Sequence, residues 1–198
     1  EWSGFSDRRY LLKGSTNQSI TDKDVAVVEI YSARSARWRG VASVHCWLAI
    51  KRPHEPTFSR YEVIGWNAKN GQPMIVKTDG KSDDYWYGYR PVKIFELVGD
   101  AAIAVIDAVV IEMSNYPYSK KYKAWPGPNS NTFIAHIARK IPAIDVDLPP
   151  TAIGKDYVEG LQITAPPSTR GYQINIGGLF GMILSPEEGF EINIASAV

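Results

Sequence analysis

The feature that most constrains the fold is an alternating run at residues 41–51, VASVHCWLAIK. Side chains in a β-strand point to opposite faces in turn, so a period of two separates the run into two sets. One set is apolar and consists of Ala42, Val44, Cys46, Leu48 and Ile50. The other contains Ser43, His45, Trp47 and Ala49. We therefore predict a strand that places Cys46 in an apolar layer and His45 on the opposite face.

Other segments supply partners for this strand. Residues 25–31 (VAVVEIY) have the β-branched content of a buried strand, and residues 60–66 (RYEVIGW) return after a proline-containing turn. Residues 74–78 predict a shorter strand, followed by a polar loop to Pro91. Near the C-terminus, residues 172–176 and 190–194 alternate around a Ser-Pro-Glu-Glu-Gly turn, which predicts a hairpin.

Two segments predict helices. Residues 100–113 carry a stripe at helical spacing, and Asp100 is placed to cap its start. A second helix is expected to begin near Asn129 and to end before Pro142. We therefore expect an α+β fold with an antiparallel sheet and two main helices. Residues 1–24 are expected to form an irregular arm, and residues 25–198 a single domain.

Charge and cysteine content exclude several classes of protein. The chain has 22 basic and 21 acidic residues, which lacks the positive charge expected of a nucleic-acid-binding protein. Its single cysteine, Cys46, allows no internal disulfide and is too few for a thiolate zinc site. The basic segment at residues 33–40, which includes Arg34, Arg37 and Arg39, is expected to be a solvated loop, or alternatively an anion or lipid-headgroup contact.

Motifs for cofactors and metals are absent from the sequence. The three histidines are widely separated, and neither His-Glu-x-x-His nor Cys-x-x-Cys occurs. Gly154-Lys155 does not form a phosphate loop, because Pro149 occupies the position of the required upstream glycine. The glycines at residues 177–181 fall within a strand pattern. We expect neither a cofactor nor a metal.

The most distinctive segment, residues 125–133 (WPGPNSNTF), leads into the second helix. Asn129 or Ser130 is expected to cap that helix by accepting backbone N–H groups. A functional interpretation of the same site makes Ser130 a nucleophile, because a helix N-terminus favours developing negative charge. Asn129 or Asn131 would then contribute to an oxyanion site.

A serine nucleophile also requires a base, and His45 is the best candidate. His136 lies six residues after Ser130 and on another side of the helix, and His54 is in a proline-flanked turn that we expect to be exposed. Tyr61 or Glu62 on the returning strand could orient His45.

Several runs together resemble an uncharacterised bacterial family that is catalogued as a domain of unknown function. The resemblance covers nearly the whole chain, and the runs are VHCW, GW, WYG, YPY, WPGPNSNTF, LPPTAIGKDY and GYQ. It carries no activity over to this chain. It does imply an envelope protein at the periplasmic face of the inner membrane, held by an N-terminal anchor. A first residue of Glu1 instead of Met agrees with the removal of such a segment.

A more remote resemblance is to the permuted papain-like hydrolases and acyltransferases related to NlpC, in which a strand histidine precedes an Asn-Cys-x-x-Phe helix start. Here His45 precedes Asn129-Ser130-Asn131-Thr132-Phe133, with serine in place of the cysteine. A neutral serine is a weaker nucleophile than a thiolate beside a histidine.

Three interpretations remain open at this point. The first is hydrolysis or acyl transfer at an amide or ester of an envelope substrate, such as a peptidoglycan peptide or a lipid. The second is a non-catalytic module that binds a ligand or partner in an aromatic groove, with Trp86 and Tyr87 among its walls. The third is a purely structural role for Asn129, Ser130 and Thr132, which would brace the loop against residues 148–157. The expected binding residues are Trp47, Trp66, Trp125 and Lys155.

Overall fold

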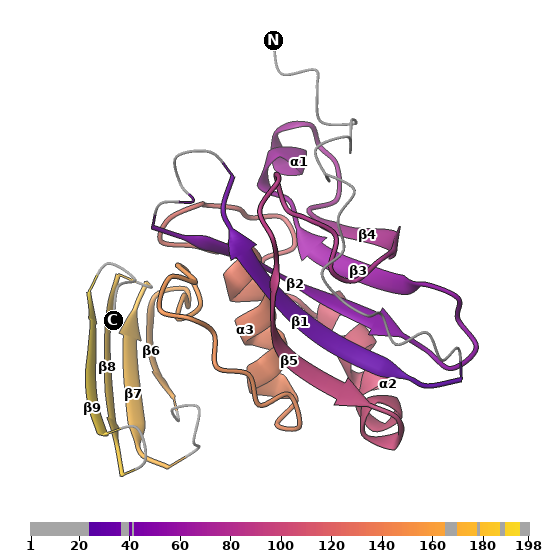
Figure 1. The fold of residues 1–198 in the computed structure, drawn as a ribbon. Coiled ribbons are helices and arrows are strands. Elements are labelled where there is room, and N and C mark those ends of the chain that lie inside the picture. The colour runs from indigo at the N-terminus through magenta and orange to yellow at the C-terminus, as the bar shows by residue number, and fades with distance from the viewer. Residues whose placement is uncertain are drawn as a thin grey trace.

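The computed structural model describes residues 24–36, 40, 42–164, 170–177, 179–186 and 189–194. Within these residues the strands form two antiparallel sheets, and the fold class is α+β, as predicted (Figure 1). The expected arm at residues 1–24 lies outside the described residues except for Asp24, and Arg37 and Arg39 also lie outside them.

The first sheet has five strands in the order β4-β3-β2-β1-β5. Its strands are β1 (Val27–Arg34), β2 (Val44–Lys51), β3 (Phe58–Val63), β4 (Ile75–Gly80) and β5 (Val92–Val98). Three helices accompany it, α1 (Gly65–Lys69), α2 (Asp100–Ser114) and α3 (Ser130–Lys140). The second sheet has the order β6-β7-β8-β9 and consists of β6 (Leu161–Thr164), β7 (Tyr172–Ile176), β8 (Phe180–Ser185) and β9 (Gly189–Ile194).

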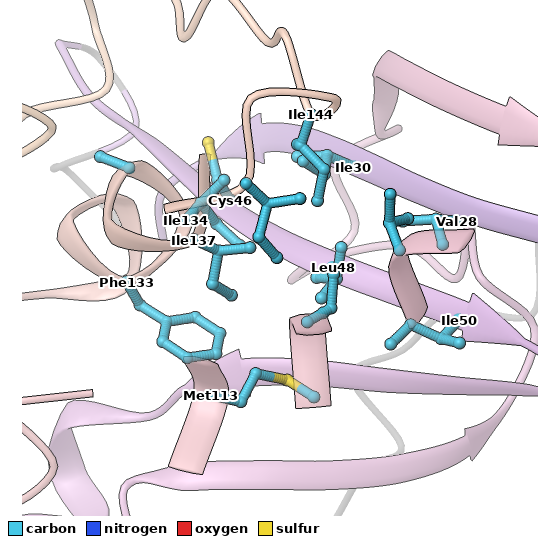
Figure 2. Packing of buried hydrophobic residues seen from close by; sticks show 14 of the residues in the cluster. Val28, Ile30, Cys46, Leu48, Ile50, Met113, Phe133, Ile134, Ile137 and Ile144 are labelled. Carbon is cyan, nitrogen blue, oxygen red and sulfur yellow. The ribbon is translucent and has the colours of Figure 1, made fainter. Parts of the chain in front are cut away.

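Helices α2 and α3 lie against one face of the first sheet (Figure 1). The register pairs Ile30 with Leu48, so that alternate residues of β1 and β2 line this face together. Figure 2 shows these side chains packed with residues of α3, among them Phe133 and Ile137. Cys46 is fully buried in this layer, which confirms the interpretation of the β2 alternation.

On the opposite face of the first sheet, the loop at residues 81–91, between β4 and β5, covers the part around Trp47. Trp47 of β2 is completely buried there, stacks on Tyr31 at 5.6 Å and donates from Nε1 to the carbonyl oxygen of Ser82 at 2.8 Å. Trp86 from the same loop packs in this cluster. Helices therefore cover one face of the first sheet, and this loop covers the other face around Trp47.

Helix α3 begins as the sequence predicts. The Asn129 side chain accepts from the N–H groups of Asn131 and Thr132, and the Thr132 hydroxyl accepts from the Asn129 N–H at 3.1 Å. This reciprocal pair is a capping box, which satisfies backbone donors that an isolated helix start leaves free. In α2, by contrast, Gly99 is the N-cap and Asp100 is the first helical residue, with no side-chain cap.

Three segments differ from the sequence-based expectations. Strand β5 was not predicted, because it is a partly exposed edge strand whose side chains do not alternate cleanly in burial. Gly65 and Trp66 were expected in a strand, but they begin α1. Strand β9 does pair with an antiparallel strand, but that strand is β8; the expected strand at Tyr172–Ile176 is β7, which pairs with the other edge of β8.

Among the described residues, none of the helices is long and apolar enough to cross a membrane.

Candidate active site

A pocket opens where the beginning of β2 meets the first turn of α3. Its cavity volume is about 80 Å³. His45 and Ser130, which are 85 positions apart in the sequence, both line it. Three aromatic side chains, Trp66, Trp86 and Tyr122, form much of the remaining wall. The fold thus brings the predicted base and the predicted nucleophile to one cavity.

His45 is held by two contacts on the loop-covered face of the sheet. Its Nε2 lies 2.8 Å from Oε2 of Glu62 on β3, and its ring stacks on Trp86 with centroids 3.9 Å apart. Of the two partners considered for His45, the structure selects Glu62. Tyr61 alternates to the other face and packs against the helical core.

Glu62 is buried and paired with a second charged residue. Arg60 donates from Nη2 to Glu62 Oε2 at 3.1 Å, and its Nε lies 3.1 Å from Oε1. The Arg60 guanidinium also sits 3.9 Å from the centre of the Trp47 ring, a cation–π contact. Burial by itself raises the pKa of Glu62, but the Arg60 charge and the hydrogen bonds from His45 and Arg60 lower it to about 2.

These surroundings fix the chemical state of His45. Burial lowers the pKa of His45, and the Glu62 carboxylate opposes that shift only in part. The imidazole is therefore neutral near pH 7. Because an ionised Glu62 can only accept, we assign the ring proton to Nε2, which leaves the Nδ1 lone pair available as a base.

Ser130 is the first residue of α3 and is 5% exposed. The Asn129 side chain accepts from the backbone N–H groups of Asn131 and Thr132. The Ser130 N–H is therefore left without a partner in the first turn of the helix. The Ser130 hydroxyl makes no hydrogen bond to any other residue that the structure describes. Its hydroxyl and its N–H are thus both available to a molecule in the pocket.

Asn129 and Asn131 were expected to offer oxyanion donors, but their amide groups are occupied. Asn129 Nδ2 donates to the carbonyl oxygens of Ala124 and Ile153, at 3.2 and 2.9 Å. Asn131 Nδ2 donates to Val44 and Ile153, at 3.0 and 2.9 Å, and its Oδ1 accepts from the Cys46 N–H at 3.1 Å. An amide nitrogen has only two hydrogens to donate, so neither side chain has one to spare. Both asparagines build the pocket instead.

The four expected binding residues occupy different environments. Trp66 lines the pocket. Trp47 is fully buried in the cluster that contains Trp86, and it is not among the pocket-lining residues. Trp125, which is 53% exposed, and Lys155, which pairs with Asp156 at 3.6 Å, are not among the pocket-lining residues.

The sequence analysis missed one wall of the pocket, Tyr122. Its ring lies so close to Gly65 that a Cβ at Gly65 would come within 2.2 Å of it. A glycine where a strand gives way to a helix is the signal that could have indicated this close approach.

Within the described residues, no group of three or more His, Cys, Asp or Glu side chains is arranged to hold a metal ion. The remaining histidines lie outside the pocket. His136 is 3.4 Å from Glu112 of α2, and His54 is exposed beside Asp24.

A family model described as a protein of unknown function (DUF3750) matches residues 25–157. The chain belongs to this family. The matched residues include every residue that lines the pocket, whereas β6 to β9 follow the match. Comparison of this DUF3750 protein with curated proteins and with solved structures gives no match. The expected membership of an uncharacterised family is confirmed, and the similarity to papain-like hydrolases stays a hypothesis.

Proposed function

We propose that this DUF3750 protein is a hydrolase or acyltransferase that acts on an amide or ester, with Ser130 as nucleophile and His45 as base. The observation that carries the proposal is the shared pocket, in which His45 is fixed by Glu62 and Ser130 stands at a helix N-terminus. Perturbed titratable groups that converge on a cavity are typical of active sites.

The proposed reaction has two stages, transfer of the acyl group to Ser130 and its release. The Ser130 oxygen attacks the acyl carbon as Nδ1 of His45 takes its proton, and the carbonyl oxygen becomes an oxyanion beside the Ser130 N–H. The acyl–oxygen or acyl–nitrogen bond then breaks, and His45 returns the proton to the departing alcohol or amine. Water, or a second alcohol or amine, finally releases the acyl group from Ser130.

Arg60 and Glu62 act on this reaction through His45. The imidazolium that forms during attack lies beside the Glu62 carboxylate, which stabilises its positive charge. Arg60 keeps Glu62 ionised and in place. The two residues therefore position the base without touching the substrate.

The substrate that we propose is an amide or ester of the cell envelope, such as a peptidoglycan peptide or a lipid, met at the periplasmic face of the inner membrane. Support comes from the family resemblance, and from aromatic walls at Trp66, Trp86 and Tyr122 that suit an apolar or ring-bearing group.

A second candidate function is a binding pocket without catalysis. The observation that favours it is the absence of a hydrogen bond between the Ser130 hydroxyl and His45, both of which the structure describes. Catalytic hydrogen bonds often form only in the substrate complex, so this absence does not remove the catalytic proposal.

Reaction with a fluorophosphonate probe separates the two candidates without knowledge of the substrate. The probe transfers its phosphonyl group to an activated serine with loss of fluoride, and peptide mass spectrometry locates the adduct. We expect labelling at Ser130, its loss in Ser130→Ala, and a fall of roughly 100-fold or more in rate in His45→Gln.

Ser43→Ala provides the matched control, because Ser43 lines the same pocket but lies outside the helix start. This variant should be labelled at the wild-type rate. If folded wild-type protein shows no adduct at Ser130, or if His45→Gln labels as fast as wild type, the catalytic proposal fails. Retained binding of hydrophobic ligands by such an unlabelled protein would support the second candidate.

A further inference from the structure

The second sheet has one face made entirely of apolar residues. The register aligns Ile176 with Leu161 and Phe180, and Leu184 with Tyr172 and Phe190. The resulting apolar face consists of Leu161, Ile163, Tyr172, Ile174, Ile176, Phe180, Met182, Leu184, Phe190, Ile192 and Ile194.

This apolar face is the exposed one. Tyr172 is 70%, Phe190 61% and Leu184 57% exposed. The opposite face carries polar side chains that are buried, including Gln173 and Asn175. Asn175 Nδ2 donates to the carbonyl oxygen of Asp156, which precedes the sheet, so the polar face is the covered one. This arrangement inverts the usual order of a half-buried antiparallel sheet, in which the apolar face is covered.

The exposed area is larger than a soluble surface normally leaves open. Nine of the eleven residues are between 41% and 70% exposed. With aromatic and large aliphatic side chains of roughly 150–250 Å² each, the apolar face presents on the order of 1,000 Å². The largest apolar patch of a typical monomer is about 300–600 Å², so a patch of this size marks an interaction site.

The near absence of charged residues from β6 to β9 indicates the kind of partner that fits the apolar face. The strands β6 to β9 contain one charged residue, Glu191, and no lysine or arginine. A surface that binds anionic lipid headgroups is rich in lysine and arginine, and this one has neither. A partner matched to the apolar face must itself be flat, apolar and uncharged, and the same face of a second copy meets that description.

We propose that the apolar face is a homodimer interface, in which the second sheets of two copies pack face to face. Two such faces together bury about 2,000 Å², the upper part of the range for stable protein–protein interfaces. Packed sheets lie about 10 Å apart, a spacing that side chains such as Leu184 and Phe190 fill. Related by a two-fold axis, the two copies contribute the same residues.

The dimer is tested by measuring the molar mass of the full chain by light scattering and sedimentation over a range of concentrations. The decisive variant is Leu184→Lys, in the row of the apolar face that contains Tyr172 and Phe190, and the matched control is Ile111→Lys on α2. Both residues are 57% exposed, so neither change disturbs a buried side chain.

We expect the wild-type protein and Ile111→Lys to be dimers at micromolar concentration. Leu184→Lys should raise the dimer dissociation constant by roughly 100-fold or more, because two-fold symmetry introduces two lysines into an apolar interface. Circular dichroism should show the same fold in all three proteins. A wild-type protein that remains monomeric at 100 µM or so would overturn the proposal, as would a dimer that Leu184→Lys leaves intact.

A second measurement tests the geometry directly. A spin label at Ile176→Cys should report a single short inter-copy distance, about 20 Å or less, because packed sheets lie about 10 Å apart. A label at Ile111→Cys should give a longer distance. Binding of a monomeric wild-type protein to uncharged phosphatidylcholine vesicles, lost in Leu184→Lys, would assign the apolar face to a membrane and contradict the dimer.

Discussion

The two sheets of this protein distribute polar and apolar residues in opposite ways. In the first sheet helices cover one face, and charged residues such as Arg60 and Glu62 are buried on the other face, under the loop. In the second sheet the polar face is buried and the apolar face is open. The first sheet therefore buries charged and titratable side chains, whereas the second exposes apolar ones.

The difference follows from what each sheet packs against. Two helices provide the first sheet with an apolar layer, so its other face can hold a histidine, a carboxylate and a guanidinium beneath aromatic rings. The main contacts of α2 and α3 are with each other and with the first sheet, and the apolar face of the second sheet is exposed. The DUF3750 match contains the first sheet and ends before the second.

The largest effect is expected from Arg60→Met, which leaves the Glu62 carboxylate buried without its cation. Breaking a buried ion pair in this way costs about 3–5 kcal/mol, and we expect a loss of that size in the free energy of unfolding measured with urea. The matched control is Lys77→Met on β4 of the same sheet, whose pair with Asp79 is exposed and should matter little. Equal losses in the two variants would show that the first sheet does not bury its charges as described.

A pair of leucine truncations compares the two sheets directly. Leu48→Ala removes a fully buried side chain from the first sheet and should lower the free energy of unfolding by about 2–5 kcal/mol. Leu184→Ala on the second sheet should cost below about 1 kcal/mol in dilute protein, because that side chain is 57% exposed. Raising the protein concentration should increase the cost of Leu184→Ala alone, since association then adds to stability. If the loss of stability in Leu184→Ala does not change with protein concentration, the second sheet is not stabilised by association.

Acid should destabilise the first sheet through two groups. The folded pKa of His45 lies below its ordinary value of 6.5, and that of Glu62 is about 2 against an ordinary 4.5. Both groups bind protons more readily when unfolded, so the free energy of unfolding should fall as the pH drops below about 6.5 and fall further between about 4.5 and 2. Urea unfolding across this range measures it. His45→Gln should flatten the upper part of the profile, and an unchanged slope would contradict the burial of His45.

The smallest effect is expected from Ser130→Cys. A helix N-terminus favours a thiolate by roughly 0.3–1 kcal/mol, so the thiol introduced by this change should react with iodoacetamide several-fold faster than one introduced by Ser43→Cys in the same pocket. The native Cys46 should stay unreactive in both variants, because burial raises the pKa of its thiol. The rates can be followed by mass spectrometry. Equal rates for the two introduced thiols would show that the start of α3 does not stabilise a thiolate.

Much of the first sheet could be predicted from the sequence, because its central strands are rich in β-branched residues or alternate between an apolar and a more polar set. The alternation of β2 separated Cys46 from His45 correctly, and the Asn129 cap followed from local hydrogen-bonding preference. The pairing of His45 with Glu62 needed the register between β2 and β3, which sequence alone does not fix.

The errors arose where tertiary packing decided the outcome. Alternation showed that Trp47 shares a face with His45, but not that the loop at residues 81–91 would cover it. Asn129 and Asn131 were expected to donate hydrogen bonds to an oxyanion. Their side-chain N–H groups instead donate to carbonyl oxygens of distant segments, which the sequence does not place beside them. The proposed catalytic roles of Ser130 and His45 remain predictions that the labelling experiment tests.

The hydrogen bonds on either side of Ser130 have a consequence for substitutions at position 130. Asn129 and Asn131 connect the start of α3 to the loop at Ile153 and to the backbone around His45, whereas Ser130 itself carries none of these connections. A change of Ser130 to alanine or cysteine therefore leaves all of these hydrogen bonds in place. Under the proposed function, a single substitution at position 130 would therefore change the nucleophile while Asn129 and Asn131 keep their hydrogen bonds.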